Sequence, residues 1–109
     1  MVFRNENDIL HVIFTDEKNG EKINVELKLP HLCGTEKQID WGRDIRTKLI
    51  LKRLEIIEKE GGIDNLMQDK TVTVEEAIDN FLSLDKKIDE LLHKTTNASD
   101  IIDNLLNIA

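Results

Sequence analysis

The sequence predicts an α+β fold, in which an N-terminal β-hairpin packs on a long central helix that two or three C-terminal helices follow. Apolar residues flank Asn19-Gly20, and T-x-x-Q and T-x-x-E sequences at Thr35 and Thr73 mark two helix starts. An apolar pattern of helical period follows each start. A chain of 109 residues has room for one core, so we expect a single domain over residues 1–109.

Residues 1–33 are predicted to form the β-hairpin. Asn19-Gly20 is a dipeptide that accepts positive φ at both central positions of a type I′ turn. With these two residues as the loop, the apolar pairs on one face are Phe14 with Val25, Val12 with Leu27 and Leu10 with Leu29. A slip of one residue would turn every apolar side chain of one strand to the wrong face, so turn and pattern support one register.

The central helix is predicted over residues 35–60. Pro30 closes the second strand, and Thr35 with Gln38 forms a capping box at the helix start. Gly61-Gly62 ends the helix.

Residues 63–109 are predicted to be helical, with Thr73 and Glu76 as a second capping box. An apolar seam at alternating spacings of three and four residues follows, formed by Val74, Ala77, Phe81, Leu84, Ile88 and Leu91. The same register continues to the C-terminus, so one long helix over 73–109 could present its seam to a partner. The segment 95–100 is poor in helix formers and rich in capping residues, and we favour a break there.

Composition and charge exclude several classes of protein. Three Phe, one Trp and no Tyr are too few aromatic residues for a typical base-stacking platform. The single Cys33 excludes an intramolecular disulfide, and no apolar run approaches the ~20 residues of a membrane span. Polar residues from Asn5 onward interrupt any signal peptide, so we expect a cytoplasmic protein. The formal charge of -7 is uneven, since residues 61–109 contain ten acidic and four basic residues.

A helical wheel of the central helix places Gly42, Arg46 and Arg53 between two apolar stripes. One stripe contains Ile50, Leu54 and Ile57, and the other contains Trp41, Ile45, Leu49 and Ile56. A buried cation needs a partner, so we expect the hairpin and the C-terminal helices to cover the two stripes while Arg46 and Arg53 reach acidic residues of those helices. The alternative is that both arginines line a groove and bind a carboxylate or phosphate of a partner. Close packing would explain a glycine inside the helix.

The sequence contains no nucleophile motif, glycine-rich phosphate loop or zinc-binding spacing. His31 and Cys33 are two potential metal ligands without an obvious third. We therefore expect no enzyme activity, no metal and no cofactor.

The segment from Leu32 to Arg46 resembles a short stretch of uncharacterised bacterial, plasmid and phage proteins, of the form L-x-G-T-x-K-Q-I-x-W-[AG]-x-x-I-R. The resemblance covers about 15 residues and brings no known activity. It implies that six residues act as one unit, a capped helix turn with an aromatic and an arginine on its inward side: Thr35, Lys37, Gln38, Trp41, Ile45 and Arg46. It also implies a mobile-element origin.

These observations predict a small non-enzymatic protein-binding module, with no membrane partner and no direct binding of nucleic acid. One form is a phage or mobile-element inhibitor that acts through its acidic helical face, and a homodimer through the C-terminal helices is another expectation. The alternative function is a nucleic-acid-associated regulator that uses the basic patch of the central helix. The candidate partner-binding residues are Arg43, Arg46, Arg53, Asp79, Asp89, Glu90 and Asp103.

Overall fold

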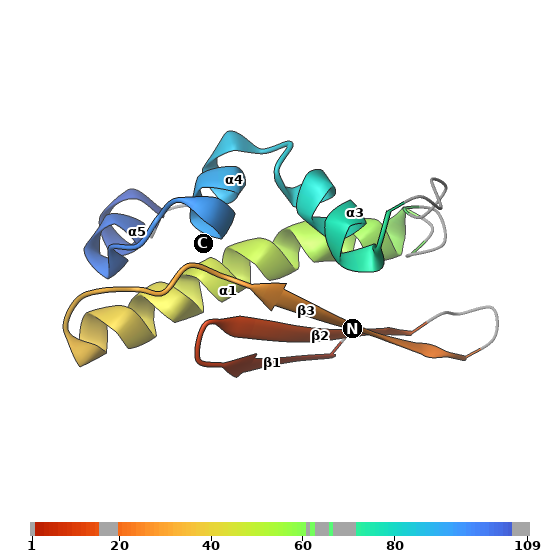
Figure 1. Cartoon of the computed structure of the whole chain (residues 1–109), viewed down its shortest axis with the longest axis horizontal. Coiled ribbons are helices and arrows are strands. Elements are labelled where there is room, and N and C mark those ends of the chain that lie inside the picture. The colour runs from red at the N-terminus through yellow and green to blue at the C-terminus, as the bar shows by residue number, and fades with distance from the viewer. Residues whose placement is uncertain (1, 16–19, 61, 63–65, 67–71, 106–109) are drawn as a thin grey trace.

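The computed structural model describes residues 2–15, 20–60, 62, 66 and 72–105, with side chains through residue 103. It confirms the α+β class. The strands are β1 (Val2–Glu6), β2 (Ile9–Thr15) and β3 (Lys22–Lys28), and the helices are α1 (Glu36–Lys59), α3 (Val74–Leu82), α4 (Lys86–His93) and α5 (Ala98–Leu105). Figure 1 shows the antiparallel sheet below α1 and the three short helices above it, so the helices lie on one side of the sheet.

The β2–β3 hairpin forms as predicted, but its predicted register is wrong by two residues. Val12 lies opposite Val25, and the last pair before the connection is Thr15 with Lys22. The connection is therefore longer than a two-residue turn, and its residues 16–19 lie outside the described part. A shift of two preserves the alternation of faces, so the predicted apolar face is still the buried one.

Strand β1 was not predicted. It pairs with β2 through a tight turn in which Asn7 has a φ of 55°, a conformation that Asn tolerates better than most residues. All five residues of β1 are exposed, as expected of an edge strand. Strand β1 contacts α1 where the Asn5 Nδ2 donates to the Thr47 Oγ1 at 2.9 Å, and the turn after it places Asp8 beside α1.

Helix α1 begins and ends within one residue of the predicted bounds. The Thr35 side chain accepts from the Gln38 backbone N–H while the Gln38 side chain accepts from the Thr35 backbone N–H, which completes the capping box. Both predicted apolar stripes contribute to one hydrophobic core with the sheet and the C-terminal helices. Trp41 and Ile56, near the two ends of one stripe, are exceptions with 49% and 38% exposure.

Over residues 72–105 the chain forms three short helices, so the possibility of one continuous helix is wrong. The break favoured near residues 95–100 is confirmed, since α4 ends at His93 and α5 begins at Ala98. A second break between α3 and α4 was not predicted. There Asp85 caps α4 by accepting from two backbone N–H groups, and Leu84, a predicted seam residue, is 84% exposed in the turn.

Helix α5 docks near the N-terminus of α1 through two close contacts. Gly42 faces Ala98, and a Cβ built on Gly42 would lie 3.4 Å from the Ala98 Cβ, which agrees with the close packing expected at this glycine. Beside it, Cys33 forms a parallel β-bridge with Asn97, in which the Cys33 N–H donates to the Thr96 carbonyl at 2.7 Å. These contacts attach the last described helix to the start of α1.

Candidate functional site

The guanidinium of Arg46, the buried arginine of α1, lies at the turn between β1 and β2. Its Nη2 donates to Oδ1 of Asp8 at 3.1 Å, and its Nη1 donates to the backbone carbonyl of Pro30 at 2.8 Å. Only 2% of the Arg46 side chain is exposed. The expectation that Arg46 reaches the C-terminal helices is therefore wrong, because the unpredicted turn places a carboxylate beside α1 from the sheet side.

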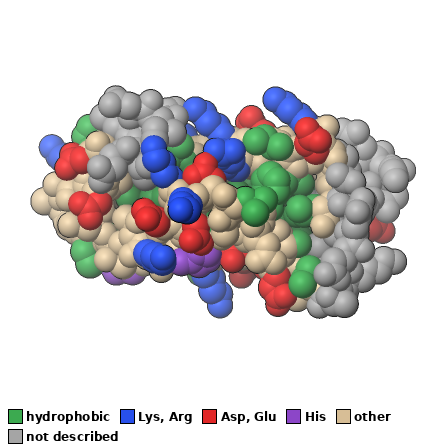
Figure 2. Space-filling view, turned by 90° about the horizontal axis from the view of Figure 1, so that it is seen from above, with side chains coloured by type: hydrophobic (Ala, Val, Ile, Leu, Met, Phe, Trp, Pro, Cys, Tyr) green, Lys and Arg blue, Asp and Glu red, His purple; other side chains and the backbone are tan. Residues whose placement is uncertain are grey.

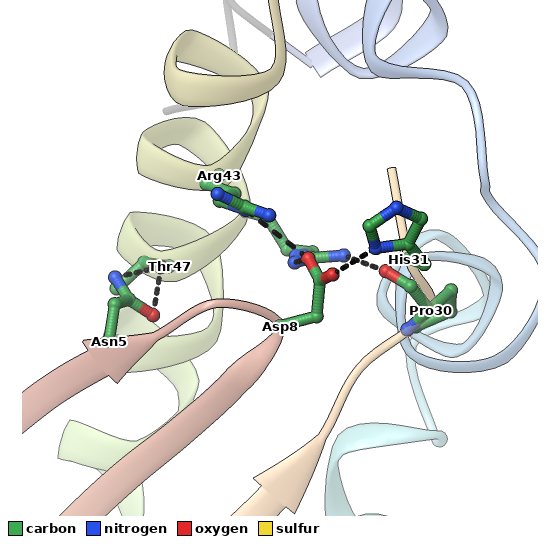
Figure 3. A network of polar contacts seen from close by, with 7 residues as sticks. Asn5, Asp8, Pro30, His31, Arg43 and Thr47 are labelled. Atoms are coloured by element: carbon green, nitrogen blue, oxygen red, sulfur yellow. Dashed lines mark hydrogen bonds and ion pairs between the residues drawn. The ribbon is translucent and has the colours of Figure 1, made fainter. Parts of the chain in front are cut away.

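Asp8 gathers three basic side chains, and we call Asp8, His31, Arg43 and Arg46 the Asp8 cluster (Figure 3). The Arg43 Nε donates to Oδ1 at 3.2 Å, and the His31 Nδ1 lies 2.7 Å from Oδ2. Asp8 is only 12% exposed and Arg43 24%, whereas His31 is 79% exposed. The cluster thus joins the β1–β2 turn, the segment after β3 and helix α1 around one carboxylate.

The electrostatics of the cluster favour the ionised carboxylate. Burial by itself would raise the pKa of Asp8, but hydrogen bonds from His31, Arg43 and Arg46 outweigh it and hold that pKa below the usual 3.8. Burial lowers the pKa of Arg46, although Asp8 acts in the opposite direction. Arginine remains charged in proteins nonetheless, so the cluster is an ion pair built into the fold.

Arg53 reaches an acidic residue of the C-terminal helices, as predicted. Its Nη2 forms a short ion pair with Oδ2 of Asp85, the residue that caps α4. The other carboxylate oxygen of Asp85 accepts from the backbone N–H groups of Lys87 and Ile88. Asp85 therefore couples the start of α4 to the second half of α1.

Asp79 and Asp89, two of the candidate acidic residues, meet at His93. The Nε2 of His93 lies 2.8 Å from Oδ1 of Asp79 on α3, and its Nδ1 lies 2.8 Å from Oδ1 of Asp89 on α4. Burial by itself would lower the pKa of His93, but its hydrogen bonds to Asp89 and Asp79 outweigh burial, and the pKa lies above the ordinary 6.5. The hydrogen bond from His93 lowers the pKa of Asp89 in turn. A protonated His93 donates to both carboxylates and links α3 to α4.

We predict that His93→Gln destabilises the protein more at pH 6 than at pH 9. A histidine whose folded pKa is raised contributes all of its stabilisation below the unfolded pKa of 6.5 and loses it as pH rises through the folded value. His93 and Asp79 are each 42% exposed, so we expect the melting temperatures to differ by only about 1–4 °C at pH 6. Thermal unfolding of both proteins across this pH range measures the difference. A difference that widens toward pH 9 would contradict the charged bridge.

Asp79 also lines a groove between β3 and α3, which Leu92 of α4 closes on one side. The groove has a volume of about 360 Å³ and is lined by Glu26, Leu27, Lys28, Glu75, Asp79 and Leu92. Leu27 and Leu92 form its apolar part, and its three carboxylates face a single lysine. We call it the β3–α3 groove.

The remaining candidate residues do not join this groove. Glu90 lines a separate, open surface between α4 and α5 together with Asp100, Lys87 and Lys94, where two acidic and two basic side chains balance. Asp103 is exposed on α5. Figure 2 shows the same mixture of acidic and basic side chains on the helical face, with hydrophobic side chains gathered right of its centre. The acidic residues of the C-terminal half are therefore dispersed, and the β3–α3 groove is where three of the chain's carboxylates line an apolar hollow.

Within the described ranges, no three His, Cys, Asp or Glu side chains are arranged to hold a metal ion. Cys33 is exposed. No helix in the part of the chain that the structure covers is long and apolar enough to cross a bilayer. Comparison of the chain with protein-family models, with curated proteins and with solved structures finds no match.

Proposed function

We propose that the protein is a non-enzymatic protein-binding module whose β3–α3 groove receives a basic segment of a partner protein. The observation that carries this proposal is the combination of Glu26, Glu75 and Asp79 around the apolar Leu27 and Leu92. An apolar side chain of the partner would fill the hollow, and flanking Lys or Arg side chains would pair with Glu75 and would compete with His11 for Glu26 and with His93 for Asp79.

An enzyme that handles nucleic acid is one class of partner that fits, as for a phage or mobile-element inhibitor. Its nucleic-acid groove is basic, and an acidic surface competes for such a groove by electrostatic complementarity. Homodimer formation through the C-terminal helices stays a separate expectation. Two residues of the predicted seam, Ile88 and Leu91, are already buried within the chain itself.

The alternative, a nucleic-acid-associated regulator, has less support. Arg43 and Arg46 pair with Asp8, and Arg53 pairs with Asp85. Each of the three arginines would have to exchange an intramolecular carboxylate for a phosphate. Binding to nucleic acid depends on free cations that release counterions from phosphates, so the basic patch is weaker than its sequence indicates.

The groove is tested with a labelled peptide of alternating Leu and Lys clusters at helical spacing, measured by fluorescence anisotropy. Glu75→Lys is expected to weaken binding about fivefold to tenfold, because one attraction is lost and one repulsion is gained at an exposed site. Glu90→Lys is the matched control, since it changes the net charge equally on an exposed helical position outside the groove. We expect the control to change binding less than twofold at 0.15 M salt. Equal weakening by both variants would show that only net charge matters and would contradict the proposed groove.

A further inference from the structure

A second groove lies between α1 and α4, and its charge is opposite to that of the chain as a whole. It has a volume of about 220 Å³ and is lined by Leu49, Lys52, Arg53, Ile56, Asp85, Lys87 and Ile88. It shares no lining residue with the β3–α3 groove. We call it the α1–α4 groove.

The apolar lining of this groove has two buried residues and one that is partly exposed to solvent. Leu49 and Ile88 are buried and form its floor, whereas Ile56 is 38% exposed. Leu84, which precedes the lining residue Asp85, is 84% exposed but does not line the groove.

The rim of the groove is basic. Lys52, Arg53 and Lys87 supply three positive charges, and the single negative charge, Asp85, is held by Arg53 and by the N-terminus of α4. The lining residues therefore have a formal charge of +2 on a protein whose formal charge is -7, and the exposed Lys87 is the cation that a partner carboxylate would reach. An occupant with carboxylates is favoured there and is repelled by most of the remaining surface.

We propose that the α1–α4 groove is a second binding site, which accepts an acidic amphipathic helix of a partner protein. The groove is smaller than the roughly 300–1,000 Å³ of typical small-molecule sites, and its size suits one or two anchoring apolar side chains. Those side chains would contact Leu49, Ile56 and Ile88, while an Asp or Glu residue of the same helix faces Lys87. With an acidic groove and a basic groove at separate places, the module would join two segments of opposite charge.

Fluorescence anisotropy with a labelled helical Leu/Glu peptide tests the site. Lys87→Glu is expected to weaken binding about tenfold, since it reverses one rim charge. Lys86→Glu is the matched control, because Lys86 is the neighbouring exposed residue and does not line the groove; we expect a change of less than twofold. Ile56→Ser is expected to weaken binding about fivefold through the lost apolar contact. Val2→Ser, at a strand position with 64% exposure, is its control.

Several results would overturn the proposal. If Lys86→Glu and Lys87→Glu weakened binding equally, binding would depend on net charge alone and not on the groove. If a Glu/Ser peptide bound as tightly as the Leu/Glu peptide, the apolar side chains of the peptide would contribute nothing. Preference for a labelled DNA duplex over the Leu/Glu peptide would make the groove a phosphate-binding patch. The two peptides keep this test separate from that of the β3–α3 groove. Lys87→Glu should not weaken binding of the Leu/Lys peptide, and Glu75→Lys should not weaken binding of the Leu/Glu peptide. Lys87 is exposed, so its variant tests the site even where Ile56→Ser fails to fold.

Discussion

Asp8→Ala is expected to destabilise the protein by about 3–5 kcal/mol and to lower its melting temperature by roughly 10–20 °C. The substitution leaves the guanidinium of Arg46, which is 2% exposed, without its carboxylate. A buried charge that loses its partner costs more than the pair contributed, because the charge remains desolvated. Urea and thermal unfolding of the variant measure the loss.

The double variant Asp8→Ala/Arg46→Met is the control for this reasoning. Methionine fills much of the space of the arginine without a charge, and it also removes the buried Nε of Arg46, which has no hydrogen-bond partner. We expect the double variant to recover more than half of the stability that Asp8→Ala loses. A double variant as unstable as Asp8→Ala would show that the cost does not come from an unpaired charge.

The same cluster predicts how the wild-type protein responds to acid. The pKa of Asp8 is lowered in the folded state, so the stability it contributes is present above the unfolded pKa of 3.8 and is lost as pH falls through the folded value. Asp8→Ala lacks this carboxylate. Its stability should therefore fall less steeply than that of the wild type as pH drops below 4.

The features that sequence analysis predicted correctly depend on local chemistry. The capping box of α1 and the N-cap of α3, where the Thr73 side chain accepts from the Glu76 N–H, each need residues three positions apart, and the bounds of α1 follow from Thr35 at one end and the glycines at the other. The buried faces of β2 and β3 follow from a two-residue period. Such signals are complete within a short segment.

The features that it missed depend on contacts between distant segments. A hairpin shifted by two residues buries the same faces, so alternation alone could not distinguish the observed register of Val12 with Val25. Strand β1 buries none of its residues and has no strong apolar pattern. Because β1 was missed, the turn that brings Asp8 to Arg46 was missed with it, and the partner of the arginine was misassigned.

The candidate acidic residues illustrate the same limit. Asp89 and His93 are four residues apart on one helix, a spacing visible in the sequence. Asp79 reaches the same imidazole only because the chain turns at residues 83–85. Asp85 provided a signal for that turn, since Asp is a common N-cap, but the apolar seam continued through it and favoured an unbroken helix.

Substitutions at Gly42 should separate two effects that act in opposite directions. A Cβ at this position would lie 3.4 Å from the Ala98 Cβ and 3.5 Å from the Ala98 carbonyl oxygen, which is ordinary van der Waals contact. Gly42→Ala therefore fits and should stabilise the protein by about 0.5–1 kcal/mol through higher helix propensity. Gly42→Leu adds three further carbons toward α5, and we expect a loss of about 1–3 kcal/mol or more.

The loss in Gly42→Leu should be located at the junction of α1 and α5. Displacement of α5 would break the bonds in which the Cys33 N–H donates to the Thr96 carbonyl and the Ala98 N–H donates to the Cys33 carbonyl. Hydrogen exchange at these two amides should accelerate in Gly42→Leu and stay slow in Gly42→Ala. Asp44→Leu, at an exposed position of α1, is the control for the leucine itself and should change stability by no more than about 0.5 kcal/mol. A Gly42→Leu protein with wild-type stability and slow exchange at both amides would mean that α5 does not depend on the close approach of Gly42 and Ala98.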